Sequence, residues 1–73
     1  MTMTREFNTD LPSVRQIQNF IRDGQEVELK LVTSDILTGK VRWQDANCLC
    51  LIDAYDQPTL IWHQAIAFIK ARV

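Results

Sequence analysis

The reactive side chains of this sequence are one histidine and two cysteines. His63 lies between two short apolar runs, and Cys48 and Cys50 lie two positions apart in a third. A catalytic site needs a nucleophile, a base or paired carboxylates within reach of one another, and no spacing here indicates such a set. One histidine and two cysteines also fall short of the four ligands of a closed zinc site. We therefore predict that the protein is not an enzyme and holds no metal or cofactor.

The 73 residues are enough for one small domain, and 47% of them are hydrophobic. Small domains commonly add a disulfide, a metal or oligomerisation to a modest core. Cys48 and Cys50 would share one face of a strand, too far apart to form a disulfide without distortion. Oligomerisation is therefore the remaining source of additional stability.

Two free thiols and no signal peptide favour the cytoplasm, and no apolar run approaches the roughly 18 residues of a membrane span.

Residues 11–24 carry the signals of an amphipathic helix. Pro12 suits a first helical turn, where its missing N–H is not needed. Apolar side chains then recur at helical spacing, at Val14, Ile17, Phe20 and Ile21. Gly24 follows at a position where a left-handed residue commonly ends a helix. Residues 1–10 show no such periodicity, and we expect them to form a mobile tail.

From residue 26 the apolar period changes to two, which indicates strands. In the second strand, Trp43 is expected on the same apolar face as Leu37 and Val41. Gly39 interrupts that face and indicates a bend or a close backbone approach, and Asp45 suits the cap of the next turn. The predicted strands are residues 26–31, 36–44, 48–52, 59–62 and 65–71. One helix followed by five short strands is typical of a small barrel.

Two motifs narrow the fold class. Residues 39–45, GKVRWQD, resemble the first Sm signature, in which a strand glycine is followed six positions later by an aspartate at a turn. Residues 61–66, IWHQAI, look like the second signature of the bacterial branch, the Hfq family. The resemblance covers residues 11–69 and implies an Sm-like domain at residues 11–73. Its fold would be mostly β with an N-terminal helix, as a strongly bent five-stranded sheet forming a small open barrel.

The resemblance further implies assembly into a homo-hexameric ring, in which the fourth strand of one subunit pairs with the fifth strand of the next. Exposed edge strands invite such pairing, and a ring that closes leaves no edge free. The ring would therefore also supply the stability and the apolar burial that 73 residues lack.

RNA binding is the function that the resemblance implies, as an RNA chaperone that pairs small RNAs with messengers in post-transcriptional regulation. The family binds uridine-rich RNA on the helix side of the ring, around the pore. The matching positions here are Ser13, Asn47, Trp62, His63 and Gln64. Trp62 keeps an aromatic side chain, while His63 and Gln64 keep hydrogen-bond donors. The family's lysine and a second aromatic are replaced, so we expect weakened affinity.

Two further RNA-binding surfaces of the family are matched less well. The opposite face reads adenine-rich RNA, and its counterparts here are Lys30, Ser34, Ile36 and Thr38. Lys30 replaces a stacking tyrosine and can contact phosphate only, so we expect altered specificity. The rim carries an arginine cluster in the family, for which this chain offers Arg15 and Arg22.

Two functional hypotheses follow. The first is an RNA-binding ring, resembling the short Hfq-like proteins of cyanobacteria. The second is a ring that serves as a protein-interaction hub, with RNA binding lost or delegated to a partner that docks on the helix side near Asn19 and Arg22. The net charge of −1, from 8 basic and 9 acidic residues, is weak support for a nucleic-acid binder. Trp43 and Trp62 also suit packing in a core or an interface.

Overall fold

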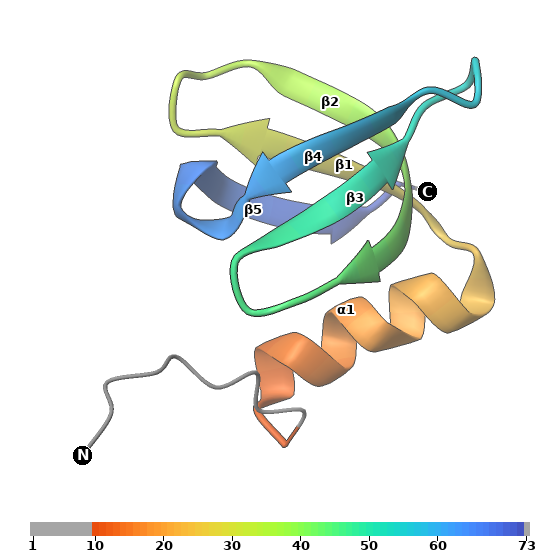
Figure 1. Ribbon diagram of the computed structural model, residues 1–73, viewed down its shortest axis with the longest axis vertical. Helices are drawn as coiled ribbons and strands as arrows, with labels where there is room; N and C mark the ends of the chain where they lie inside the picture. The colour runs from red at the N-terminus through yellow and green to blue at the C-terminus, as the bar shows by residue number, and fades with distance from the viewer. Residues whose placement is uncertain (1–9, 73) are drawn as a thin grey trace.

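The computed structural model describes residues 10–72, which form one helix and five strands in the predicted order (Figure 1). Helix α1 spans Pro12–Asp23, with the proline in its first turn. Gly24 ends the helix in the left-handed conformation, at φ 61°. Its N–H donates to the carbonyl of Ile21, and the next N–H donates to that of Phe20. The predicted helix is confirmed, while the expected tail lies, apart from Asp10, outside the described residues.

The five strands form one antiparallel sheet in the order β4-β3-β2-β1-β5. They are β1 (Glu26–Leu31), β2 (Ile36–Gln44), β3 (Cys48–Ile52), β4 (Pro58–Trp62) and β5 (Ile66–Ala71). A short 3-10 turn, His63–Ala65, takes up the start of the predicted fifth strand. The sheet is strongly curled, and α1 lies across one end of it (Figure 1). Within residues 10–72, β4 and β5 each keep one edge without a partner strand.

The core fills the concave side of the sheet. Its buried members come from four strands and are Val27, Leu29, Val41, Leu49, Leu51 and Ile61. Ile17, Phe20 and Ile21 of α1 pack against this cluster, so the apolar stripe of the helix faces the sheet. Strand β3 is buried along its first four residues, so both of its faces are covered. Full burial of one Leu side chain stabilises the fold by about 1.5–3 kcal/mol.

Gly39 lies where β2 and β3 approach closely. A Cβ at this position would clash with the backbone carbonyl oxygen of Ile52 and would lie 3.0 Å from its carbonyl carbon. The side chain of Leu51 would be 3.3 Å away. The two strands can therefore come together only because residue 39 has no side chain.

A bulge in β2 changes the face on which Trp43 lies. Val41 pairs with Leu51 of β3, but Trp43, two residues on, pairs with Cys50. Arg42 is therefore an extra residue in β2, and it reverses the alternation of faces. Trp43 is 40% exposed on the outer face. The prediction that it shares the apolar face with Val41 is wrong, because an inserted residue leaves no mark in a period-two pattern.

Asp45 closes the turn between β2 and β3. One of its carboxylate oxygens accepts hydrogen bonds from the backbone N–H groups of Asn47 at 2.8 Å and Cys48 at 2.9 Å. The bonds from Cys48 and then Asn47 favour the charged form and hold the pKa of Asp45 below its usual value of 3.8. Burial, and then the charge of Asp45, raise the pKa of the Cys48 thiol. Cys48 therefore packs as a neutral, small apolar group.

Substituting Gly39 with Ala is expected to lower the free energy of unfolding by about 2–3 kcal/mol, because the new methyl group meets backbone that cannot move aside. Gly24→Ala is the matched control, since open space surrounds Gly24 and only the left-handed conformation, worth about 1 kcal/mol, resists the change. Urea unfolding followed by circular dichroism measures both variants. Equal losses in the two would contradict the close approach of β2 and β3.

Asp45→Asn is expected to lower the melting temperature at neutral pH, because an uncharged amide accepts weaker hydrogen bonds than a carboxylate. The folded-state pKa of Asp45 is lowered. Its contribution is therefore fully present above the unfolded pKa and is lost as the pH falls through the folded pKa. Thermal denaturation along a pH series should show the gap between the two proteins closing in acid. A gap that stays constant would mean that the carboxylate charge plays no part.

Candidate nucleic-acid interface

Two loops far apart in the sequence meet at one end of the barrel. The backbone N–H of His63, after β4, donates to the carbonyl of Asn47 in the β2–β3 turn at 2.9 Å. Trp62 lies directly opposite Cys48 across β3 and β4. Gln64 follows in the 3-10 turn with its side chain exposed. The structure thus brings together four of the five positions predicted for the pore side.

These four residues offer stacking and hydrogen bonding without a fixed charge. Trp62 is 62% exposed, which leaves an indole surface open to an aromatic base. The Nε2 atom of His63 is buried and has no hydrogen-bond partner among residues 10–72. A buried nitrogen of this kind is costly unless something satisfies it.

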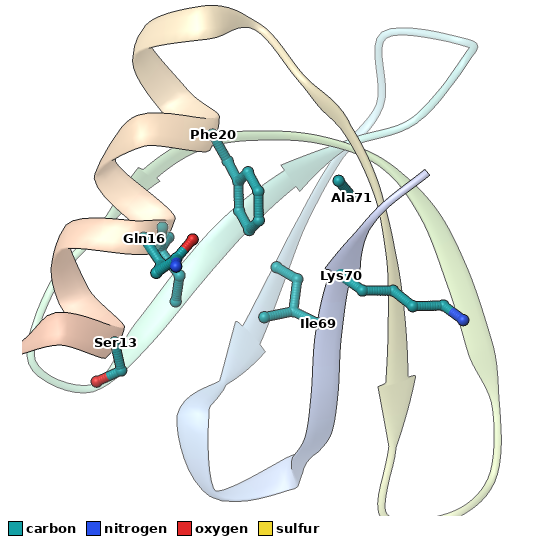
Figure 2. Close-up of a pocket in the computed structure, with 7 residues that line it drawn as sticks. Ser13, Gln16, Phe20, Ile69, Lys70 and Ala71 are labelled. Carbon is teal, nitrogen blue, oxygen red and sulfur yellow. The ribbon is translucent and has the colours of Figure 1, made fainter. Parts of the chain in front are cut away.

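Ser13, the fifth predicted position, lies elsewhere within the chain. It lines a groove between α1 and β5 with a volume of about 540 Å³ (Figure 2). Phe20 and Ile69 point into this space from the helix and the strand. The remaining lining residues are Gln16, Ile17, Lys70 and Ala71. The sequence predicts the apolar stripe of the helix. It does not predict that the sheet leaves part of this stripe uncovered.

An apolar patch lies on the outer face of the opposite edge of the sheet. Trp43, Cys50 and Leu60 are cross-strand neighbours on β2, β3 and β4. Trp62 and Cys48 form the next row on the same face. The two cysteines are free and buried, whereas Leu60 is 59% exposed. The patch therefore presents large apolar side chains over a buried layer of thiols.

The predicted adenine-side residues fall on the convex face of the sheet or beside it. Lys30 and Ile36 are directly opposite each other on β1 and β2, and Thr38 lies two residues further along the same face. Glu28 is the partner of Thr38, which places a carboxylate in this surface. Ser34 sits apart in the tight β1–β2 turn, with φ at 77°.

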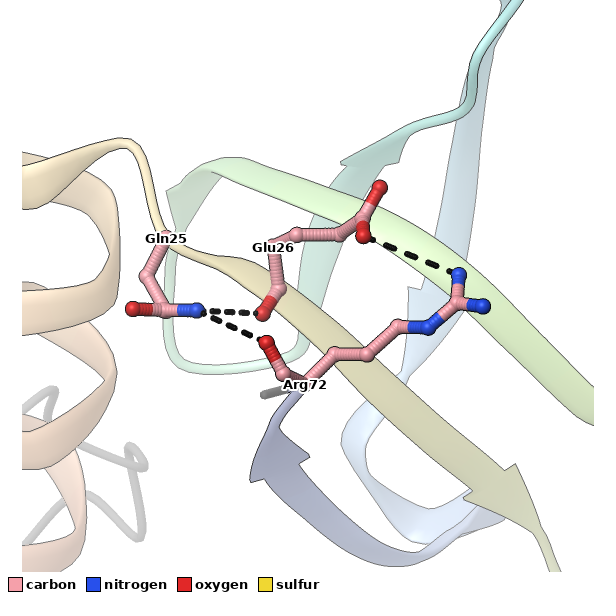
Figure 3. A network of polar contacts seen from close by, with 3 residues as sticks. All are labelled: Gln25, Glu26 and Arg72. Carbon is pink, nitrogen blue, oxygen red and sulfur yellow. Dashed lines mark hydrogen bonds and ion pairs between the residues drawn. The ribbon is translucent and has the colours of Figure 1, made fainter.

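The far end of this convex face is held by a polar network (Figure 3). The side-chain amide of Gln25 donates to the carbonyl oxygens of Glu26 and Arg72, at 2.9 and 3.3 Å. The Arg72 guanidinium lies 3.6 Å from the Glu26 carboxylate. These contacts join the start of β1 to the end of β5.

The two predicted rim arginines lie on the solvent side of α1 and do not form a cluster. Arg22 pairs with the neighbouring Asp23 carboxylate at 3.0 Å, with both side chains more than half exposed. An exposed pair of this kind contributes little to stability and partly neutralises the cation. Arg15 lines a shallow hollow on the helix together with Pro12, Gln16 and Asn19.

Sequence reasoning missed the role of Gln44. Its side-chain amide donates to the Val14 carbonyl at 3.2 Å and to the Gln18 side-chain oxygen at 2.8 Å, which fastens α1 to β2. The sequence could not predict this contact, because the bulge before Gln44 is what turns its side chain toward the helix.

Among the residues that the structure describes, no group of three His, Cys, Asp or Glu side chains could hold a metal ion. Nor does the described part of the chain include a helix able to cross a membrane.

Comparison with known proteins identifies the family. A family model described as Hfq related matches residues 11–71. The chain is similar to the crystal structure of an Hfq protein from Anabaena sp., with 50% identity, a TM-score of 0.77, and coverage of 85% of this chain and 98% of that chain. It shares its fold with a second Hfq structure, described as the pleiotropic translational regulator, at 19% identity and a TM-score of 0.76, over 81% and 97% of the two chains. No curated protein matches the sequence. The chain therefore belongs to the Hfq-related family, whose members are Sm-like RNA-binding chaperones and not enzymes.

Proposed function

We propose that this protein acts in post-transcriptional regulation as a hexameric ring that binds uridine-rich RNA weakly on its pore side. The observation that carries the proposal is the junction of the β2–β3 turn with the β4–β5 loop. There the exposed indole of Trp62 lies beside His63, whose Nε2 lacks a partner among the described residues. A base stacked on Trp62 would place its hydrogen-bonding edge near His63 and Gln64.

Complementary surfaces at the two sheet edges support the ring. The edge of β5 borders the apolar groove under α1, and the edge of β4 carries the exposed side chains of Leu60 and Trp62. If β4 of one copy pairs with β5 of the next, each open edge gains backbone hydrogen bonds. The apolar patch of one copy then covers the groove of its neighbour. Such a heterologous contact closes when the rotation between copies fits a ring.

Ring formation would also complete the RNA site. Ser13 lies in the groove of one copy, away from Trp62 of the same chain. When a neighbour's β4 fills that groove, Ser13 comes beside the neighbour's Trp62. The five predicted residues would then act together across the subunit interface.

Weak affinity follows from the charges at this site. Its polar members, Asn47, His63 and Gln64, carry no fixed positive charge, and Asp45 below them holds a carboxylate. Phosphate contacts by cations normally supply much of the affinity for RNA. The two rim arginines, Arg15 and Arg22, add only a weak attraction for the RNA phosphates.

The buried, free thiols of Cys48 and Cys50 suit the reducing cytoplasm, where we place the ring.

A protein-interaction hub is the second candidate function. The observation that favours it is the solvent side of α1, where Arg15 and Asn19 border a shallow hollow instead of a basic cluster. A protein partner with a complementary polar surface could dock there on each subunit. RNA would then be bound by the partner or not at all.

Leu60→Lys is expected to convert the ring into monomers, because it places a charge in the apolar contact between copies. Leu60 is 59% exposed in one chain, so the monomer fold should tolerate the change. Tyr55→Lys is the matched control, since Tyr55 is 84% exposed on the β3–β4 loop. Light scattering gives the mass of each variant. If Leu60→Lys still forms an intact ring, the proposal that β4 lies in the interface between copies is wrong.

Trp62→Ala and His63→Ala are each expected to lower the affinity for short uridine-rich RNA by about tenfold, in line with the loss of one stacked base or of its hydrogen bonds. Fluorescence anisotropy at low and moderate salt measures the affinity, and light scattering verifies the ring. Trp62→Phe, which retains an aromatic ring, should stay close to the unchanged protein.

Unchanged affinity in both alanine variants would contradict the pore-side assignment. If the unchanged ring binds neither uridine-rich nor adenine-rich RNA at low salt, the RNA-binding proposal fails and the protein hub is the better account.

A further inference from the structure

Cys48 and Cys50 form a pair of buried thiols on the outer face of β3. Both are free, and the two residues are only 7% and 3% exposed. Because side chains alternate along a strand, these two point to the same face, while Leu49 between them belongs to the core. The pair lies beneath the apolar patch, and the RNA contact proposed above makes no use of either thiol.

The spacing of the two thiols is too wide for a disulfide but suits an ion held between them. Two residues of a strand span about 6.8 Å, whereas the Cβ atoms of a disulfide lie about 3.5–4.5 Å apart. An ion bound at a metal–sulfur distance of about 2.3 Å needs its two sulfur atoms about 4.6 Å apart. Two cysteine side chains that lean toward each other along the strand can reach this separation. Burial, then Asp45, and after them the charge of Cys50 raise the pKa of the Cys48 thiol, so the two thiols are close enough to influence each other.

The cover of the pair is apolar and aromatic. Cys48 lies directly opposite Trp62 on β4. Cys50 lies between Trp43 on β2 and Leu60 on β4. Side chains of this size keep water away from the sulfur atoms, which protects a metal–thiolate bond from competing oxygen ligands.

The carboxylate of Asp45 adjoins Cys48, but it is already engaged. One of its oxygens accepts the hydrogen bonds from the backbone N–H groups of Asn47 and Cys48. Carboxylate oxygen is also a hard ligand that suits Mg²⁺, Ca²⁺ or Mn²⁺, whereas thiolate sulfur is soft. The two thiols are therefore the ligands that this place offers.

Two thiolates without a third ligand favour a soft monovalent ion. No three His, Cys, Asp or Glu side chains come together among the described residues, so Zn²⁺ with its four ligands has no site there. Thiolate sulfur selects Cu(I), which two thiolates can hold in a linear arrangement. We infer that Cys48 and Cys50 form a binding site for one Cu(I) ion in each subunit. The expectation that the chain holds no metal came from the ligand count of zinc, and Cu(I) needs fewer ligands.

Binding exchanges protons for the ion. Two S–H bonds break, two S–Cu bonds form and two protons pass to solvent, while the oxidation states of copper and sulfur stay the same. Without the ion, burial favours the protonated form of Cys48. A bound metal ion deprotonates its thiol ligands outright, so burial does not prevent the exchange. This site does not depend on RNA binding.

The test is a competition for Cu(I) between the full-length protein and the chelator bicinchoninate, without oxygen and with ascorbate as the reductant. We expect the protein to retain one Cu(I) per subunit and to retain no Zn²⁺ under the same conditions. Cys48→Ala and Cys50→Ala should each lower the Cu(I) affinity by at least about 100-fold, because each removes one of only two ligands. Trp43→Phe is the matched control, since it changes a neighbour of Cys50 without removing a ligand, and it should retain the ion.

X-ray absorption at the copper edge of the unchanged protein is the second measurement, and it decides the question even if an alanine variant fails to fold. Circular dichroism and light scattering verify the fold and the assembly of each variant. Two sulfur neighbours with no nitrogen or oxygen are expected around copper. Nitrogen or oxygen neighbours would mean adventitious copper held elsewhere, for example by His63, and would overturn the inference. Loss of all Cu(I) to the chelator, or full affinity in either alanine variant, would overturn it as well.

Discussion

The close approach of β2 and β3 at Gly39 is the constraint on which the rest of the structure depends. Strand β2 pairs with β1 through residues 36–40 and with β3 through residues 40–44, so Gly39 lies where the strand passes from one neighbour to the other. A side chain there would meet the Ile52 carbonyl and hold the strands apart. Without that approach the sheet could not curl around its core. The bulge at Arg42 adds to the local twist just beyond this point.

Curling the sheet determines what meets at its ends. It brings the β2–β3 turn against the β4–β5 loop, where a single backbone hydrogen bond joins Asn47 and His63. It also leaves the edges of β4 and β5 unpaired within the described chain, one beside an apolar patch and the other beside an apolar groove. The features that favour assembly and those that favour RNA binding therefore have the same geometric origin.

The two faces of the subunit differ in their electrostatics, and the difference bears on how RNA would be held. At the junction of the β2–β3 turn with the β4–β5 loop, Asp45 holds a carboxylate, so an RNA contact there would rely on stacking and hydrogen bonds. On the convex face, Lys30 lies opposite Phe68, and the Lys70 ammonium group is 5.7 Å from the centre of the Phe68 ring.

Much of the fold could be predicted because its signals are local. The proline at the start of α1, the glycine at its end and the change of apolar period from helical to two all act within a few residues. Gly39 was recognisable as a position that needs the absence of a side chain, and the two short motifs indicated the family. These features depend on backbone conformation and on the burial of one face, which neighbouring residues set.

The candidate sites depend on cross-strand register, and only the tertiary structure decided that. The bulge at Arg42 turned Trp43 outward and Gln44 toward α1, although the residue types on either side alternate normally. Phe68 lies opposite Lys30, 38 positions away in the chain, because β5 pairs with β1. Ser13 lies apart from Trp62, because Ser13 lines the groove between α1 and β5. Sequence alone cannot supply these relations, because a shift of one residue in register moves a side chain to the other face at no cost to the local pattern.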